Sequence, residues 1–168
     1  MKKSITCAFT GYRSLLLPWK HDETNEKCLA LKKQIREQII KAVDDGYYYF
    51  ICGMSLGCDI YFAELVLELK KTNSLIELIP TIPYEYQYAS WNKKNRERYF
   101  DILSGCSLKK VISPIYTGTC LMDKNKYMVD KSSRLIAVYN GDGKSSSRKT
   151  IKYAEKTGVD IVIIKYLK

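Results

Sequence analysis

The sequence predicts one α/β domain built on a doubly wound, mainly parallel sheet with helices on both faces. Short β-prone runs alternate with segments of helical periodicity along the chain, as in proteins made of repeated strand–helix–strand units. Several β-prone runs, such as 135–138, are continuously apolar, which is typical of strands that helices cover on both sides. The length of 168 residues and the hydrophobic share of 46% fit a single domain over residues 1–168 with a full core.

The first elements follow from local patterns. A β-prone run over 5–9 predicts a strand, and apolar residues recurring every three or four positions predict a helix over 26–43. A run rich in aromatic residues predicts a second strand over 47–52. After a glycine-containing turn, a second apolar stripe predicts a helix over 56–71.

The middle of the chain continues the alternation. The run over 75–82 predicts a third strand, closed by Pro83, and the segment over 91–103 has the apolar spacing of a helix. A fourth strand is expected over 108–113. The following segment, 123–132, is either a short helix or an ordered loop.

The C-terminal part ends the alternation with a strand over 134–139, a helix over 147–157 that Gly158 ends, and a strand over 159–165. Right-handed crossovers place all the strand-to-helix loops at one edge of such a sheet. Ligands of these folds bind in the crevice at that edge, beyond the C-terminal ends of the strands. We therefore expect the functional residues in the loops that follow the strands.

Composition narrows the class of protein. No apolar run approaches the roughly 20 residues of a membrane span, so we expect no membrane partner. The short apolar run after Met1-Lys2-Lys3 stops at Thr10, so we expect no signal peptide. We therefore expect a cytoplasmic location. The six cysteines form no Cys-x-x-Cys pair and fit reduced, buried thiols. With a single histidine, no metal site and no required cofactor are expected. The formal charge of +10 fits either binding of nucleic acid or a phosphorylated ligand, or a solvated lysine-rich surface.

The loops after the strands hold glycines, cations and hydroxyl groups, which together suit an anionic ligand at helix N-termini. Tyr84, Gln87 and Trp91 are either core residues or contacts to a base, and Asp59 is either a ribose ligand or a helix-start acid. The candidate ligand-binding residues of these loops are Thr10, Gly11, Tyr12 and Arg13 after the first strand, Gly53, Met54, Ser55, Gly57 and Asp59 after the second, Tyr84, Gln87 and Trp91 after the third, and Asn140, Gly141, Gly143, Lys144, Ser145, Ser146, Ser147 and Arg148 after the fifth.

The loop after the fifth strand resembles two phosphate-binding motifs without meeting either. Gly141-Asp142-Gly143 begins a G-x-G-x-x-G pattern, but serine stands at the last glycine position and the loop is not in the first strand–helix–strand unit. A P-loop ending at Lys144-Ser145 would need glycine at position 138, which is valine. What remains is a serine-rich, cationic loop before a helix.

A set of segments recurs in the order expected of one protein family, and they are Thr10–Arg13, Gly53–Asp59, Ile82–Tyr84, Trp91, Tyr127–Asp130, and Leu135–Tyr139 leading into Thr150–Ala154. Taken in this order, they resemble the SLOG superfamily, the Rossmann-like group that includes DprA and the Lonely Guy enzymes, and within it the YpsA-like family of small bacterial and phage proteins. By this resemblance, Asn125 and Asp130 match a third family motif and join the candidate ligand residues, although Lys124 stands where arginine is typical.

The resemblance implies a nucleotide-type ligand, derived from NAD or ADP-ribose, in the crevice. Relatives usually carry Gly-Gly-Thr where this chain has Ser145-Ser146-Ser147, and the glutamate that assists cleavage in Lonely Guy enzymes is absent from that segment. We therefore expect non-catalytic sensing or sequestration, with no catalytic residue; one form is a phage anti-defence protein that captures cyclic ADP-ribose. Alternatives are a nucleotide N-glycosidase using Asp59 or Asp130, a DprA-like single-stranded DNA binder, and a cell-division interaction protein. Since relatives often pair, a homo-oligomer is expected.

Overall fold

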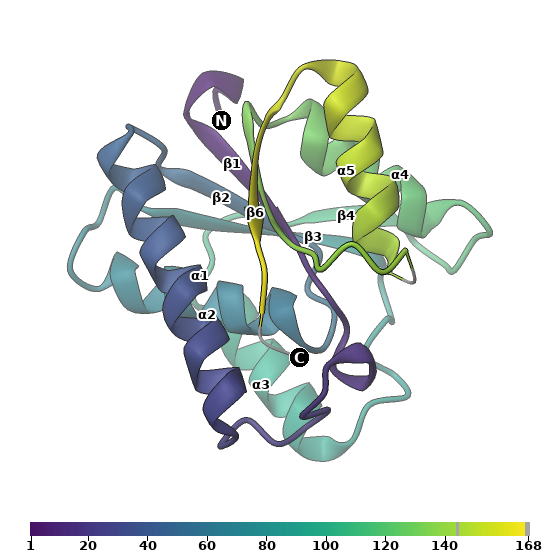
Figure 1. Cartoon of the computed structure of the whole chain (residues 1–168). Helices are drawn as coiled ribbons and strands as arrows, with labels where there is room; N and C mark the ends of the chain where they lie inside the picture. Colours follow the sequence, from purple (N-terminus) through teal and green to yellow (C-terminus); the bar gives the residue numbers. More distant parts are fainter. Residues whose placement is uncertain (144, 167–168) are drawn as a thin grey trace.

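The computed structural model describes residues 1–143 and 145–166 and shows a three-layer α/β arrangement (Figure 1). The described residues form a six-stranded sheet whose neighbouring strands all pair in parallel. The predicted doubly wound parallel sheet is confirmed. In spatial order its strands are β4 (Lys110–Ser113), β3 (Glu77–Tyr84), β2 (Tyr49–Cys52), β1 (Thr6–Thr10), β5 (Arg134–Val138) and β6 (Asp160–Ile164).

Helices cover both faces of the sheet. On one face lie α1 (Glu26–Asp44), α2 (Cys58–Lys70) and α3 (Lys93–Ser104), and on the other lie α4 (Cys120–Asp130) and α5 (Ser146–Thr157) (Figure 1). Short 3₁₀ turns precede and follow β1, at Lys3–Ile5 and Ser14–Leu16. The segment that the sequence left open between helix and loop is therefore a helix. Among the described residues, no helix combines the length and the apolar character that a membrane crossing requires.

The third strand runs past its predicted end. We expected Pro83 to close it, but β3 continues to Tyr84 and pairs there with Ser113 of β4. The reason is that β2 ends at Cys52, opposite Pro80, so this part of β3 needs partners on only one side. A residue without an N–H group is tolerated at such a half-paired position.

Apolar residues on alternate strand positions fill two cores. Phe9 and Phe50 belong to the core under α1, α2 and α3, whereas their neighbours Ala8 and Ile51 belong to the core under α4 and α5. The two-residue period of a strand sends successive side chains to opposite faces. Because both faces are buried, the strands are continuously apolar, as the sequence indicated.

The strand order places the switch point of the sheet beside β1. Successive strands extend from β1 to β4 on one side, and β5 and β6 then extend on the other side. The connections after β1 and β5 therefore diverge, which opens a crevice at the C-terminal ends of the strands. The loop after β2 lies next to it.

Candidate functional site

The loops after β1 and β2 are joined into one unit by backbone hydrogen bonds. The N–H of Ser14 donates to the carbonyl of Leu56 at 3.1 Å, and the N–H of Cys58 donates to the carbonyl of Tyr12 at 3.1 Å. Gly57 lies at φ 109°, and a Cβ there would stand 2.6 Å from both Ser14 N and Tyr12 O. Glycine is therefore required at this position, both for its backbone conformation and for the close approach of the two loops.

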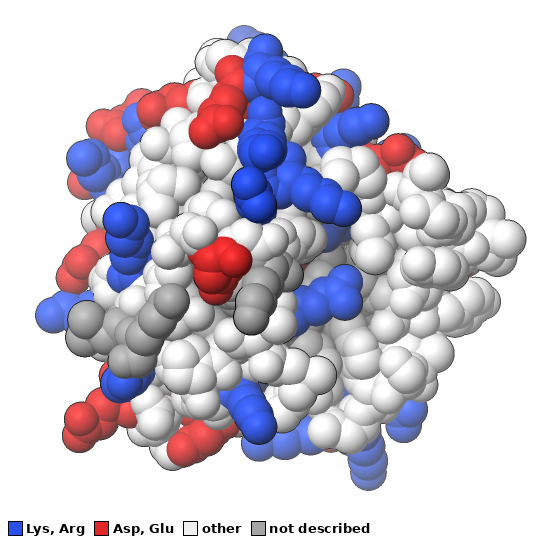
Figure 2. Space-filling view, turned by 45° about the vertical axis from the view of Figure 1, so that its right-hand side comes forward, with Lys and Arg blue, Asp and Glu red and all other residues white. Residues whose placement is uncertain are grey.

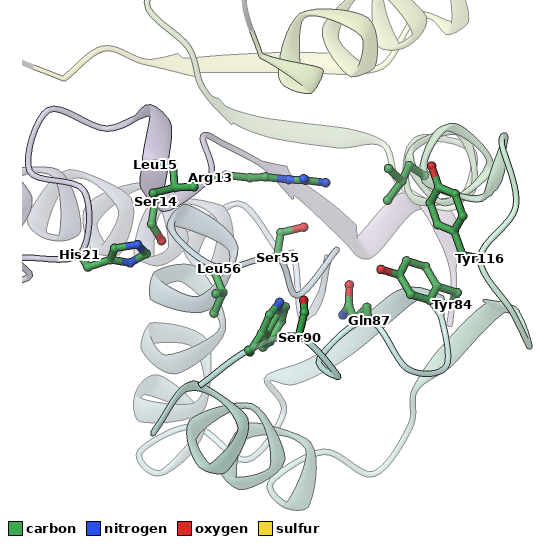
Figure 3. Close-up of a pocket in the computed structure, with 12 residues that line it drawn as sticks. Arg13, Ser14, Leu15, His21, Ser55, Leu56, Tyr84, Gln87, Ser90 and Tyr116 are labelled. Carbon is green, nitrogen blue, oxygen red and sulfur yellow. The ribbon is translucent and has the colours of Figure 1, made fainter. Parts of the chain in front are cut away.

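The joined loops form one wall of a cavity of about 460 Å³ at the C-terminal edge of the sheet. Figure 3 shows Arg13 extending across this cavity, with Tyr84 and Tyr116 at one end and His21 and Leu15 at the other. The rings of Tyr84 and Tyr116 meet edge to face, with 5.3 Å between their centroids. The residues that line the cavity are Arg13, Ser14, Leu15, His21, Ser55, Leu56, Tyr84, Gln87, Ser90, Trp91, Tyr116 and Leu121.

Two residues of opposite charge, Lys124 and Asp59, are buried beside Gly53. A Cβ on Gly53 would stand 2.2 Å from Lys124 Nζ and 3.0 Å from Asp59 Oδ2. Lys124 comes from α4 and Asp59 from the first turn of α2, and each is only 7% exposed. Glycine at position 53 thus leaves the space that the lysine side chain occupies.

The two charges differ in how they are satisfied. Asp59 Oδ2 accepts a hydrogen bond from the backbone N–H of Ser55 at 3.1 Å. Within residues 1–143 and 145–166, no hydrogen bond or ion pair reaches the Lys124 ammonium group. The Lys124 nitrogen is not among the fully buried, unpaired side-chain atoms of the described residues, so it keeps some exposure through which an anion can approach. An anion bound in the crevice would satisfy it.

Burial shifts the pKa values of both groups toward their neutral forms. It raises the pKa of the Asp59 carboxyl group, and the positive charge of Lys124 opposes that shift. It lowers the pKa of the Lys124 ammonium group, and the negative charge of Asp59 opposes that shift. Arg13 adds positive potential at both groups. Titrating groups with shifted pKa values are a common mark of functional sites, and Asp59 is linked to the cavity through Ser55, which lines it.

The loop after β5 is attached to the end of β1 through Tyr12. The Tyr12 hydroxyl donates to Asp142 Oδ1 at 2.9 Å and accepts from the backbone N–H of Asn140 at 3.1 Å. A second link joins β1 to α5: the hydroxyl of Thr10, the last residue of β1, donates to Oγ of Ser147 in the first turn of α5 at 3.4 Å. Ser145, the residue that precedes α5, is buried, and its hydroxyl finds no partner among the described residues. The start of α5 therefore offers a second place for an anion.

The structure groups the predicted residues into three sets. Five of them line the cavity, and they are Arg13, Ser55, Tyr84, Gln87 and Trp91. Eight more are buried or half-buried and do not line the cavity, and they are Thr10, Gly11, Tyr12, Gly53, Met54, Gly57, Asp59 and Asn125. The described residues of the β5–α5 loop form the separate group beyond Tyr12, and they are Asn140, Gly141, Gly143, Ser145, Ser146, Ser147 and Arg148. Their roles in binding stay predictions.

Several predicted residues have structural partners of their own. The side chain of Met54 packs in the core, and its carbonyl accepts from Gln87 Nε2 at 3.4 Å. The Asn140 side chain exchanges two hydrogen bonds with the backbone of Tyr166, each 3.1 Å long. Asp130 lies at the far end of α4, where it accepts from the Tyr153 hydroxyl at 3.0 Å, and the structure does not bring it to the cavity. Lys144 falls outside the described residues.

Sequence reasoning missed the residue with the most unusual environment. Lys124 entered only as a departure from the usual arginine. Its spacing held a signal, because Cys120, Lys124 and Met128 follow each other at four-residue steps and all three are buried. A lysine in the apolar stripe of an amphipathic helix marks a buried cation. Tyr116 and His21, also missed, are exposed loop residues whose sequence context gave no such signal.

The fold and the cavity define a Rossmann-like α/β protein with a cavity at the C-terminal ends of β1, β2 and β3. The chain belongs to the YpsA family of SLOG proteins, because the family model described as "YspA SLOG family" matches residues 7–168. It is 30% identical to UPF0398 protein BH1768 of Halalkalibacterium halodurans over 128 residues, which cover 75% of this chain and 68% of that protein. It is also 30% identical to a UPF0398 protein of Bacillus cereus over 158 residues, covering 90% and 83% of the two chains.

A solved structure has a similar fold. It is that of DNA processing protein A from Helicobacter pylori, described for its single-stranded DNA binding mode. The superposition has a TM-score of 0.62 at 16% sequence identity and covers 95% of this chain. The present chain spans 64% of the length of that chain. At this identity the likeness shows the shared fold alone.

Proposed function

We propose that this protein binds a phosphorylated nucleotide in the crevice, with a phosphate between Lys124 and Arg13. The observation that carries the proposal is Lys124, a residue only 7% exposed, whose ammonium group has no hydrogen-bond or ion-pair partner among the described residues and lies beside the backbone of Gly53. Arg13 extends across the same cavity (Figure 3). A bound phosphate would accept charge-assisted hydrogen bonds from both side chains.

The shape of the cavity supports a nucleotide rather than a bare anion. Its volume of about 460 Å³ lies in the usual range for small-molecule sites, about 300–1,000 Å³. Tyr84, Trp91 and Tyr116 give it aromatic surface on which a base could stack. Arg13 and the aromatic surface thus line one cavity, and Ser55, whose backbone N–H bonds to Asp59 beside Lys124, lines it too.

Within this class, we favour a ligand with two phosphates derived from ADP-ribose. The second phosphate would lie toward the start of α5, where the Ser145 hydroxyl is buried without a partner among the described residues. The Thr10 hydroxyl bonds to Ser147, which ties the end of β1 to that helix start. Holding such a ligand, as a sensor or a sequestering protein for a signal such as cyclic ADP-ribose, is the form of function that we favour.

The test is native mass spectrometry of the protein purified from cells, followed by incubation with ADP-ribose, NAD and AMP. The proposal expects a nucleotide mass adduct that the Lys124→Met variant loses, and recovery of the added nucleotide intact. Release of a free base or of ribose phosphate would instead favour an N-glycosidase, with Asp59 as the acid or base because burial raises the pKa of its carboxyl group. If the protein and its Lys124→Met variant bind all three nucleotides equally well or not at all, the site is wrongly assigned.

Binding of single-stranded DNA is a second candidate function. It draws on the fold shared with DNA processing protein A of Helicobacter pylori and on the formal charge of +10. A crevice that holds a mononucleotide would then hold one unit of a longer strand. Competition between AMP and an oligodeoxythymidine for the crevice distinguishes this reading from free-nucleotide binding.

A further inference from the structure

A row of lysines follows the solvent side of α5, away from the cavity described above. At about 100° per residue, Lys149, Lys152 and Lys156 fall within about 60° of arc on the helix surface. The residues opposite them, Thr150, Ile151 and Ala154 among others, are buried. All three lysines are exposed. In Figure 2, Lys and Arg side chains gather in a band on the face that carries α5, above its hollowed centre.

The row borders a surface hollow with an apolar floor. The hollow measures about 220 Å³ and is lined by the three lysines together with Met122 of α4 and Tyr153 of α5. Met122 and Tyr153 are half-buried, and the Tyr153 hydroxyl donates to Asp130 Oδ1 at 3.0 Å, which fixes the ring. The walls of the hollow are therefore cationic, while its floor is a thioether and an aromatic ring.

We propose that this hollow, defined by Met122, Lys149, Lys152, Tyr153 and Lys156, is a docking surface for single-stranded nucleic acid. One base enters the hollow and stacks on Tyr153, while the phosphates on either side of it contact the lysines. Proteins that bind single strands without sequence preference combine a basic track with aromatic platforms in this way. The surface is separate from the crevice, so this inference does not rest on the nucleotide proposed there.

The chemistry of the hollow favours this occupant over other polyanions. A duplex keeps its bases stacked inside and would leave the floor uncovered, and an acidic polypeptide would pair with the lysines but bring no flat ring to it. An anionic membrane would need apolar side chains that protrude from the helix. The exposed positions of α5 carry Ser146, Arg148, Glu155 and Thr157 besides the lysines, and none of these is a large apolar residue.

Acidic neighbours reduce the positive charge of this surface without cancelling it. Glu155 lies on one flank of the lysine row, and Asp123 and Asp130 lie on the exposed side of α4. Asp130 is engaged by Tyr153. The three lysines face solvent on the arc between these acids, so a phosphate can approach them directly.

The test measures binding of a fluorescently labelled 15-nucleotide oligodeoxythymidine by anisotropy at several salt concentrations. The variant Lys149→Gln/Lys152→Gln/Lys156→Gln is expected to bind more than tenfold more weakly at low salt. Its log–log salt slope should fall by about 2, at about 0.7 for each lost phosphate contact with a single strand. The control variant Lys33→Gln/Lys41→Gln/Lys71→Gln changes the net charge equally but lies on α1 and at the end of α2, on the other side of the sheet. It should keep nearly the wild-type affinity.

The tyrosine gives a second, independent readout. Tyr153→Ala should weaken binding several-fold without changing the salt slope, whereas Tyr153→Phe keeps the ring and should bind like the wild type. Equal losses in both triple variants would reduce the effect to net charge and overturn the proposal, as would wild-type protein that does not bind. Displacement of the oligonucleotide by poly-glutamate as readily as by unlabelled oligodeoxythymidine would also overturn it, in favour of an acidic protein partner. The Lys124→Met variant should bind the oligonucleotide normally, which separates this surface from the crevice.

Discussion

Replacing Gly53 by alanine tests the crevice with a single methyl group. The added Cβ would stand 2.2 Å from Lys124 Nζ and 2.9 Å from its Cε, closer than any carbon contact allows. These atoms are the far end of a flexible side chain, so the lysine can swing away while the backbone stays in place. The expected effect is therefore displacement of the ammonium group from the crevice, with the fold retained.

The loss of affinity can be bounded from the contact that disappears. A hydrogen bond to a charged group contributes about 1.5–3 kcal/mol. Losing one such bond from Lys124 to a phosphate weakens binding by about 10- to 150-fold. The free protein should not suffer in the same way, because the displaced ammonium group gives up no hydrogen bond or ion pair within the described residues. Its midpoint of thermal unfolding should stay close to the wild-type value or rise.

Isothermal titration calorimetry with ADP-ribose, combined with thermal unfolding, checks this expectation. Lys124→Met should lose as much affinity as Gly53→Ala, and the double variant should lose no more than either single one, because both remove the same contact. Gly118→Ala is the matched control, since nothing lies within 4 Å of a Cβ at that position. Full affinity in Gly53→Ala together with a loss in Lys124→Met, or additive losses in the double variant, would refute the reasoning.

Two further predictions follow from the same loops. Affinity for ADP-ribose should fall as pH rises. Burial raises the pKa of Asp59, which gains a repelling negative charge as the pH rises through that value, and lowers the pKa of Lys124, which loses its positive charge at a lower pH than usual. Calorimetric titrations across pH measure this fall, and Asp59→Asn should flatten the acidic part of the curve. Gly57→Ala should lower the free energy of urea unfolding by about 1–3 kcal/mol, since a side chain at φ 109° is strained and its Cβ would meet rigid backbone at 2.6 Å. The control Gly118→Ala should change that free energy by no more than about 0.5 kcal/mol. Equal effects of the two variants would contradict the close packing of the loops.

The order of the elements and the fold class could be read from the sequence, because both depend on local chemistry. The apolar spacing over 26–43 predicted a helix with one buried face, and on α1 the residues Cys28, Leu31, Ile35 and Ile39 are buried. Gly158, in the αL conformation, ends α5 as expected of a helix-terminating glycine. Element ends were less accurate. β3 continues through Pro83 because its neighbour β2 stops early, which is a property of the sheet rather than of the strand.

The candidate site divides in the same way. That the loops after β1, β2, β3 and β5 meet at one edge follows from alternating strands and helices alone. The contacts that these loops make with distant parts of the chain do not follow from that alternation. Tyr12 bonds to Asp142 across 130 positions in the sequence, and Lys124 of α4 reaches Gly53 in the loop after β2.

The sequence by itself determined the α/β class, the loops that carry the cations and hydroxyl groups, and the resemblance to the SLOG proteins. Only the tertiary structure decided that Lys124 is a buried cation without an acceptor in the described chain, and that the lysines of α5 border a hollow floored by Met122 and Tyr153. The physical reason is that periodicity and turn chemistry act between near neighbours. Burial, and hence the environment of a charge, depends on which distant elements pack against it.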